Sequence, residues 1–296
     1  MANLRDIRRR IKSVKNTAQI TKAMQLVAAS KMKKAQDQAI SGRPYADLLN
    51  KVLVNLKDQT NEDSHPLLEE RDGDRELVLL ITTDKGLCGP LNTNLLRMVA
   101  DQCPKASFVT VGNKGRQSIS RQQKDLVADF QIGDPAGYAE SKIVSEFLME
   151  QFLENKFDTV KVAFTNFINT IKQDAMIETL LPIRPIDLGR DKDFVGMGDD
   201  QQVEAGSSDT GGGYIFEPSP EKVLDTLVPQ YVNNQVFQMV LENRASEHSA
   251  RMVAMKAATD NANDMIKDLT LDYNKQRQAA ITAELLEITT AMKALE

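Results

Sequence analysis

The sequence contains no tryptophan, only two cysteines and no long apolar run. Cys88 and Cys103 are too few for a disulfide framework and fit a reducing compartment. Without a run of about 18 apolar residues, the sequence offers no transmembrane helix. Neither an apolar signal core nor a serine-rich presequence precedes the first amphipathic pattern, so secretion and organelle import are not expected. The two histidines, His65 and His248, and the two cysteines are widely scattered, which excludes the spacing of a metal site.

Glycine and proline are missing from the last 67 residues, 230–296, where four- and three-residue steps alternate without a break. This spacing predicts one helix with a coiled-coil seam, about 100 Å long at 1.5 Å per residue. Because no compact domain of this size can bury such a helix, most of it is expected to project or to lie inside another protein. The seam positions are Leu241, Ala245, His248, Met252, Met255, Thr259, Ala262, Ile266, Leu269, Tyr273, Gln276 and Ala280.

The first 41 residues also lack glycine and proline, and they carry an equally regular seam. Its positions are Leu4, Ile7, Ile11, Val14, Ala18, Thr21, Gln25, Ala28, Met32, Ala35 and Ala39. Arg43 and Pro44 are expected to interrupt the seam, and Leu48, Val52 and Leu56 to resume an apolar stripe. We therefore expect the two ends to pair as an antiparallel coiled coil. Since alanine and threonine bury little area, the pair is expected to be marginal alone and to be surrounded by other subunits.

The charge is distributed unevenly along the chain. Residues 1–57 contain 13 Lys and Arg against 3 Asp and Glu, a balance of +10, whereas the remainder carries −15. A basic first helix on an acidic chain indicates an acidic partner surface along that helix, although a solvated charged face would look the same.

The middle of the chain alternates short apolar runs with amphipathic segments. This pattern predicts an α/β domain with a mostly parallel sheet and helices on both faces. The expected strands are residues 76–83, 107–111, 126–130 and 159–167, with an edge strand at 175–181. The expected helices are residues 91–102, 113–121 and 138–152.

Residues 185–213 are rich in glycine and aspartate, which predicts a mobile surface loop. Tyr214–Phe216 is expected to form a last short strand. Pro218 and Pro220 then suit the first turn of the C-terminal helix, and Pro229 is expected to mark a kink or the true start of the rod.

The turn from Gly86 to Gly89 follows a strand and precedes a helix, as a phosphate-binding loop would. It has two of the three glycines of a dinucleotide fingerprint and lacks the Gly-Lys-Ser/Thr ending of a P-loop. Pro90 also removes one of the N–H donors that an anion would use. Cys88 has no histidine near it in sequence, so a tight turn with a structural cysteine is favoured over catalysis.

Five segments resemble the γ-subunit family of F-type ATP synthases. The segments are residues 11–32, 83–89, 166–170, 251–261 and 273–288. The resemblance covers the chain in order, and its two end motifs are long enough to be specific. Pro90, where the family has a smaller residue, the tail 289–293 and the loop 185–213 depart from the family pattern.

The resemblance implies both a fold and a function. It implies a long antiparallel coiled coil of the terminal helices plus a Rossmann-like α/β domain, with coiled-coil helices at 1–57 and 218–296 and the α/β domain at 76–217. In the family the coiled coil stands inside a ring of three α and three β subunits, and the α/β domain lies beside the ε subunit and the c ring. The γ subunit turns with the c ring and transmits torque to catalytic β subunits, and no cofactor, metal or nucleic acid is implied for it. The implied location is the cytoplasmic face of the bacterial inner membrane, through the complex.

The resemblance also implies contact residues. Those implied for β-subunit coupling are Lys22, Met24, Cys88, Arg251, Arg277, Gln278, Thr282 and Glu284. Tyr214 and Glu217 are implied to lie near the c-ring loops.

Two other functions remain open on the residues alone. A coiled-coil scaffold or nucleic-acid binder would place the basic helix on phosphates. An NAD-dependent enzyme would use the turn at Gly86.

Overall fold

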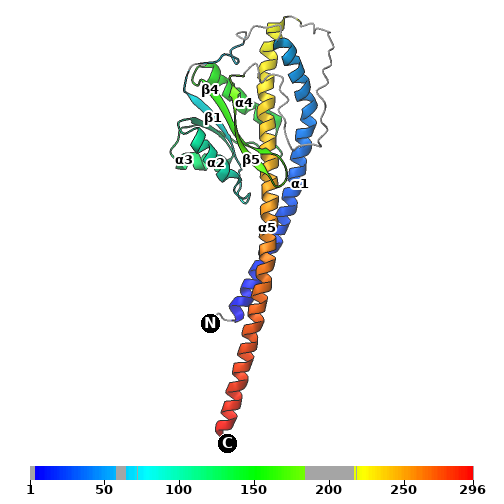
Figure 1. Cartoon of the computed structure of the whole chain (residues 1–296), viewed down its shortest axis with the longest axis vertical. Helices are drawn as coiled ribbons and strands as arrows, with labels where there is room; N and C mark the ends of the chain where they lie inside the picture. Colours follow the sequence, from blue (N-terminus) through cyan, green and yellow to red (C-terminus); the bar gives the residue numbers. More distant parts are fainter. Residues whose placement is uncertain (1–3, 58–64, 72, 184–216, 218, 296) are drawn as a thin grey trace. The chain divides into compact units, whose positions relative to one another are not determined.

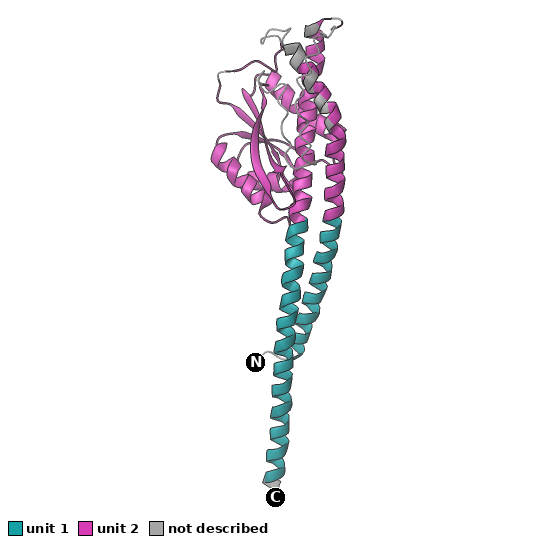
Figure 2. Cartoon of the chain, turned by 45° about the vertical axis from the view of Figure 1, so that its right-hand side comes forward, with its two compact units in different colours: residues 1–28, 252–296 teal, residues 29–251 magenta. Residues whose placement is uncertain are grey.

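The computed structural model describes residues 4–57, 65–71, 73–183, 217 and 219–295. Contacts divide the chain into two compact units, which Figure 2 distinguishes by colour: residues 1–28 with 252–296 form unit 1, and residues 29–251 form unit 2. The helices α1 (Leu4–Lys57) and α5 (Pro220–Leu295) contribute to both units. The predicted long terminal helices are therefore confirmed, and α5 passes through Pro229 without ending.

Unit 1 is a pair of helices in contact along the predicted seam. In this unit every seam position of α1 from Leu4 to Ala28 is buried or half-buried, and so is every seam position of α5 from Met252 to Ala280. The hydroxyl groups of Thr21 and Thr259 lie 2.7 Å apart in the seam. In unit 2, Tyr45 Oη donates to Gln230 Oε1 at 3.3 Å. As α1 proceeds from 21 to 45, its partner residue recedes from 259 to 230, so the helices are antiparallel.

The expected interruption of α1 at Pro44 is wrong. The helix continues to Lys57 with Pro44 inside it. Among the side chains described beyond it, Leu49 and Leu53 are buried, whereas Leu48 is 63% exposed. Four- and three-residue steps lead from Ala39 to Leu49 and Leu53, so these two leucines keep the phase of the seam. A proline inside a helix costs about 3 kcal/mol, and burial of two leucines, at about 1.5–3 kcal/mol each, offsets that cost.

Unit 2 contains a five-stranded sheet in the order β3-β2-β1-β4-β5. The strands are β1 (Glu76–Ile81), β2 (Ser107–Val111), β3 (Leu126–Phe130), β4 (Thr159–Phe167) and β5 (Gln173–Leu181). The first four are mutually parallel, and β5 pairs antiparallel with β4 at one edge. The predicted mostly parallel α/β sheet is confirmed, and β1 is shorter than expected because Thr82 and Thr83 already belong to the following loop.

Helices cover both faces of this sheet (Figure 1). Val78 and Leu80 of β1 point to one face and pack in a cluster with α2 (Leu91–Gln102) and α3 (Asn113–Arg121). Leu77, Leu79 and Ile81 point to the other face, toward α4 (Tyr138–Leu153) and the unit 2 parts of α1 and α5. The predicted loop at 185–213 and strand at 214–216 lie outside the described residues.

Candidate functional site

A short polar stretch of α5 is completely buried. All nine residues from Leu241 to Ser249 are buried, although most of them are polar or charged. They meet the carboxyl ends of the parallel strands: the backbone N–H of Thr165 in β4 donates to Asn243 Oδ1 at 3.3 Å, and Ser246 Oγ donates to the Thr165 carbonyl at 3.0 Å. Open α/β sheets bind ligands at this edge, and here side chains of α5 occupy it.

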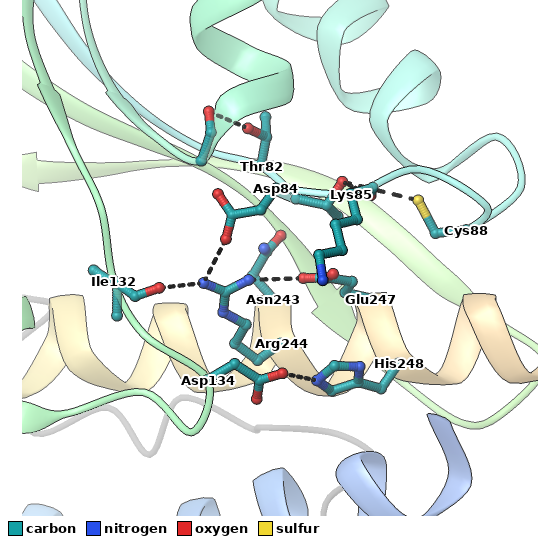
Figure 3. A network of polar contacts seen from close by, with 12 residues as sticks. Thr82, Asp84, Lys85, Cys88, Ile132, Asp134, Asn243, Arg244, Glu247 and His248 are labelled. Atoms are coloured by element: carbon teal, nitrogen blue, oxygen red, sulfur yellow. Dashed lines mark hydrogen bonds and ion pairs between the residues drawn. The ribbon is translucent and has the colours of Figure 1, made fainter. Parts of the chain in front are cut away.

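Arg244 joins α5 to the loops that follow β1 and β3 (Figure 3). Its guanidinium donates to the Ile132 carbonyl at 2.6 Å, to Asp84 Oδ2 at 3.3 Å and to Glu247 Oε2 at 2.9 Å. Burial opposes the charge, but Glu247, Asp84 and Asp134 outweigh it and raise the pKa of Arg244. The guanidinium is thus a fixed cation that attaches two loops to one helix.

Arg251 lies seven residues, about two turns, further along α5 than Arg244 and approaches the turn after β1. Its Nη2 donates to Glu247 Oε1 at 2.7 Å and to the Gly86 carbonyl at 3.3 Å, and the Lys85 carbonyl lies at 3.4 Å. The turn therefore presents carbonyl oxygens to a guanidinium. A phosphate would need N–H donors, so this geometry argues against a dinucleotide site at Gly86.

Cys88, in the same turn, is buried at 2% exposure. Its Sγ accepts from Asn92 Nδ2 at 3.4 Å, and burial raises the pKa of the thiol. A protonated, enclosed thiol is a poor nucleophile. Leu87, in the same turn, faces solvent: it is 59% exposed and has a φ of 64°.

Asp134, in the loop after β3, bridges the two long helices. Its Oδ2 lies 2.6 Å from Lys31 Nζ on α1 and 3.4 Å from His248 Nε2 on α5. Burial works to raise the pKa of Asp134, but Lys31 and His248 outweigh it and lower that pKa. Burial lowers the pKa of His248, against the influence of Glu247 and Asp134. The contact therefore joins a carboxylate to a mostly neutral imidazole at neutral pH.

The other predicted contact residues lie mainly on exposed helix surfaces. Lys22 is exposed, with Nζ 3.2 Å from Gln25 Oε1, and Met24 is half-buried. The exposed predicted residues of α5 in unit 1 are Arg277, Gln278, Thr282 and Glu284. Glu217 is exposed, and Tyr214 lies outside the described residues. Of the predicted set, the structure brings together Arg251 and the turn that carries Cys88.

Sequence reasoning missed Arg244, Glu247, Asp84 and Asp134. A signal was present: acidic residues follow two predicted strands, and Arg244 and Glu247 are spaced to share one side of a helix. Nothing in the sequence showed that this side would meet the strand ends.

The end of α5 shows the opposite property. Residues 281–293 are all exposed, although they include large apolar side chains. These are Ile281, Leu285, Leu286, Ile288 and Met292. The seam with α1 ends at Ala280, so this stretch has an apolar surface without a partner among the described residues.

The described ranges contain neither a metal-binding cluster nor a membrane-spanning helix. No group of three or more His, Cys, Asp or Glu residues in those ranges could hold a metal ion. No helix in them is long and apolar enough to cross a membrane.

Comparison with known proteins gives concordant results. A family model described as ATP synthase matches residues 3–295. The ATP synthase gamma chain of Opitutus terrae is 51% identical over 292 residues, which cover 98% of each chain. The ATP synthase gamma chain of Akkermansia muciniphila is 48% identical over 302 residues, with both chains covered completely.

Solved structures show the same fold. The central stalk and c-ring structure of the Tetrahymena thermophila mitochondrial ATP synthase contains a chain that is 26% identical, with a TM-score of 0.58, covering 81% of this chain and 99% of that one. A chain of the Euglena gracilis mitochondrial ATP synthase has a TM-score of 0.65 at 23% identity, covering 99% of this chain and 94% of that one.

Proposed function

This chain belongs to the family of ATP synthase γ chains, and from that membership and its surfaces we propose how it couples rotation to catalysis. It is the γ subunit of an F-type ATP synthase, the rotor of the central stalk, in a complex with F1 and the c ring. It is not the catalytic subunit.

The proposed partners divide between the two units. The apolar end of α5 lies inside a ring of three α and three β subunits, with catalysis in β. Unit 2 binds the ε subunit and the c ring at its foot, through Tyr214 and Glu217. This arrangement associates the chain with the cytoplasmic face of a bacterial inner membrane. The predicted segments 1–57 and 218–296 act as the shaft, and segment 76–217 as the body that receives torque.

The observation that carries the proposal is the apolar end of α5. Thirteen consecutive exposed residues with five large apolar side chains are unfavourable in water. Burying them inside a ring of other subunits removes that cost. Because this stretch extends past the seam with α1, the enclosed shaft has one helix at its end and two above it, and an off-axis cross-section results.

Rotation of such a shaft would act on β by population shift. Each angle presents a different set of side chains to each β subunit, and the β conformation that binds that set best becomes favoured. Lys22 and Met24 of α1, with Arg251 and the turn at Cys88, form one proposed set of contacts with β. Arg277, Gln278, Thr282 and Glu284 form those near the end. Arg277 is suited to a bidentate contact with a carboxylate of β.

Co-expression with α and β subunits of the same organism tests the partners. Native mass spectrometry should show one copy of this chain with three α and three β subunits, and ATPase activity should depend on it. A chain that stays outside the ring, alone or as a self-paired coiled coil, would support the scaffold hypothesis instead.

Charge reversal at Lys22 tests the coupling contacts. In reconstituted vesicles, Lys22→Glu should lower ion pumping per ATP hydrolysed, because an acidic β surface would then meet a carboxylate. Lys105→Glu, at an exposed position before β2, is the matched control and should pump normally. Unchanged pumping in Lys22→Glu would contradict the assignment of Lys22 while leaving the rotor function intact.

A further inference from the structure

Unit 2 contains a groove that shares no residue with the strand-end network or with the predicted contact residues. Its volume is about 940 Å³, comparable to sites that enclose a drug-sized ligand, about 300–1,000 Å³. Residues of α4, the segment before β1 and the start of α5 line it.

The floor of the groove is apolar. Phe130 and Phe147 pack edge to face with ring centroids 5.4 Å apart, and Leu67, which also lines the groove, is buried. Ile143 and Leu153 also line the groove but are 57% and 47% exposed. Large apolar side chains left in solvent beside a concave surface are typical of an interaction site.

The rim of the groove is acidic. Glu146, Glu150 and Glu154 recur every fourth residue and so lie on one side of α4, with Glu154 at its C-terminal cap. Asp225 belongs to α5. Two of these are neutralised: Glu146 lies 3.3 Å from Lys142 Nζ, and Glu154 lies 2.6 Å from Lys156 Nζ. Within the part of the chain that the structure describes, Glu150 and Asp225 form no ion pair with lysine or arginine.

His65 does not neutralise Asp225. Its Nδ1 accepts the backbone N–H of Leu67 at 3.1 Å, so the ring proton is on Nε2, which lies 3.9 Å from Asp225 Oδ1. Burial lowers the pKa of His65, with Asp225 opposing the shift. His65 is therefore a neutral imidazole that offers its Nε2–H as a donor, and the net negative charge of Glu150 and Asp225 in the groove remains.

We propose that this groove docks a segment of a partner protein whose apolar helix face is flanked by lysine or arginine. Its aliphatic side chains would pack on Phe147, Ile143 and Leu153. One of its cations would lie between Glu150 and Asp225, two carboxylates from different helices. An anionic lipid surface fits less well, because the same carboxylates would repel its headgroups.

The absence of tryptophan from the chain gives a direct test. A synthetic helix of roughly 14 residues, four turns long, would carry leucine on one face, lysine on its flanks and a single tryptophan among the leucines. Titrating the full-length chain into this peptide should shift the tryptophan emission to the blue and give a dissociation constant. The same peptide with glutamate in place of lysine should bind much more weakly, and equal binding of the two would overturn the proposal.

Variants locate the binding. Glu150→Gln with Asp225→Asn should weaken binding of the lysine peptide about 5-fold, as the loss of two surface ion pairs allows. Glu287→Gln with Asp101→Asn removes the same charge from exposed positions outside the groove and should leave binding unchanged. An equal loss in both pairs would show nonspecific attraction to an acidic chain and would overturn the proposal.

The apolar contacts need their own comparison. Ile143→Ser with Leu153→Ser should abolish most of the blue shift, whereas Ile171→Ser, at a site 86% exposed outside the groove, should not. Circular dichroism would confirm that each variant folds. If the serine pair does not fold, the charge variants Glu150→Gln and Asp225→Asn still test the proposal, because they alter only exposed carboxylates. Wild-type binding by a folded serine pair would overturn the proposal.

Discussion

Two stretches of the same helix reverse the usual relation between polarity and burial. Residues 241–249 of α5, with the sequence LENRASEHS, are all buried, whereas residues 281–293, with the sequence ITAELLEITTAMK, are all exposed. Hydropathy alone would predict the opposite: an exposed 241–249 and a buried 281–293. The difference shows that burial in α5 follows the available partners: strand ends and loops of unit 2 cover the polar stretch, whereas the apolar stretch has no partner among the described residues.

Several groups of the polar stretch are paired, although the buried Asn243 Nδ2 has no hydrogen-bond partner among the described residues. Arg244 has three acceptors, and Ser246 and Ser249 donate to carbonyls of Thr165 and Thr170 at 3.0 and 2.9 Å. A buried charge that loses its partner costs far more than an intact pair contributes. The stretch should therefore be sensitive to the loss of one group, and the apolar end should not.

Removal of Arg244 should have the largest effect on stability. Arg244→Ala leaves Glu247 buried beside one remaining cation, and we expect a loss of about 3–5 kcal/mol in chemical unfolding followed by circular dichroism. Arg277→Ala, at an exposed position of the same helix, is the matched control and should cost less than about 0.5 kcal/mol. Similar losses in the two variants would remove the contrast between the stretches.

A similar contrast exists between two leucines of α1. Leu53 is fully buried and Leu48 is 63% exposed, so Leu53→Ala should cost about 3 kcal/mol and Leu48→Ala less than about 0.5 kcal/mol. Thermal unfolding of both variants under one condition measures the difference. If Leu48→Ala cost more, the seam would change phase at Pro44 after all.

A smaller effect should appear in the pH dependence of stability. His248 has a lowered pKa in the folded chain and about 6.5 in the unfolded chain. Its contribution is therefore fully present above pH 6.5 and declines as the pH falls below that value, because the unfolded chain binds the proton more readily. Asp134, Glu247 and Arg251 face the ring, and the pKa of Asp134 is lowered too, so Asp134 titrates at more acidic pH.

His248→Gln should make the loss of stability between pH 7 and pH 5 shallower, since glutamine does not titrate. His65, whose pKa is lowered in the same direction, would still contribute a slope. Urea unfolding at a series of pH values measures it, and an unchanged slope in His248→Gln would show that the ring does not titrate in this range.

The smallest effect on stability is expected at the end of α5. Leu285 and Leu286 are 59% and 60% exposed, so Leu285→Ser with Leu286→Ser should change the unfolding free energy by less than about 0.5 kcal/mol. The same pair should lower the yield of complex with α and β subunits, measured by native mass spectrometry. A large loss of stability in the isolated chain would mean that this stretch already has a partner within it.

Much of the fold could be predicted because it repeats. The 4-3 spacing marked each seam residue that the structure buries in unit 1, and short apolar or alternating runs marked the strands. Pro44 misled the prediction because a local rule was applied to a helix whose buried leucines outweigh it. An edge strand was predicted at 175–181, limited by Pro182, but its antiparallel direction was not predicted.

The candidate site was harder to predict. Arg251 contacts the turn of Cys88 through Gly86, which is 165 residues away in the sequence. Only the family resemblance linked the two before the structure was known. Arg244 was missed because a charged residue at helical spacing normally indicates a solvated face, and Asp134 because a charged residue in a loop normally faces solvent. The burial of Arg244 depends on where strand ends meet α5, and a single sequence contains no measure of that distance.

The hydroxyl pair of Thr21 and Thr259 has a consequence for slippage. A slide of α5 by one heptad along α1 would place Met252 or Ile266 opposite Thr21, and the 2.7 Å contact would be lost. In a seam of small residues, alignments of the two helices that differ by one heptad pack almost equally well. A hydrogen-bonded polar pair in the seam favours one alignment over the others by about 1 kcal/mol. The hydroxyl pair therefore stabilises one alignment of the two helices and opposes their sliding past each other.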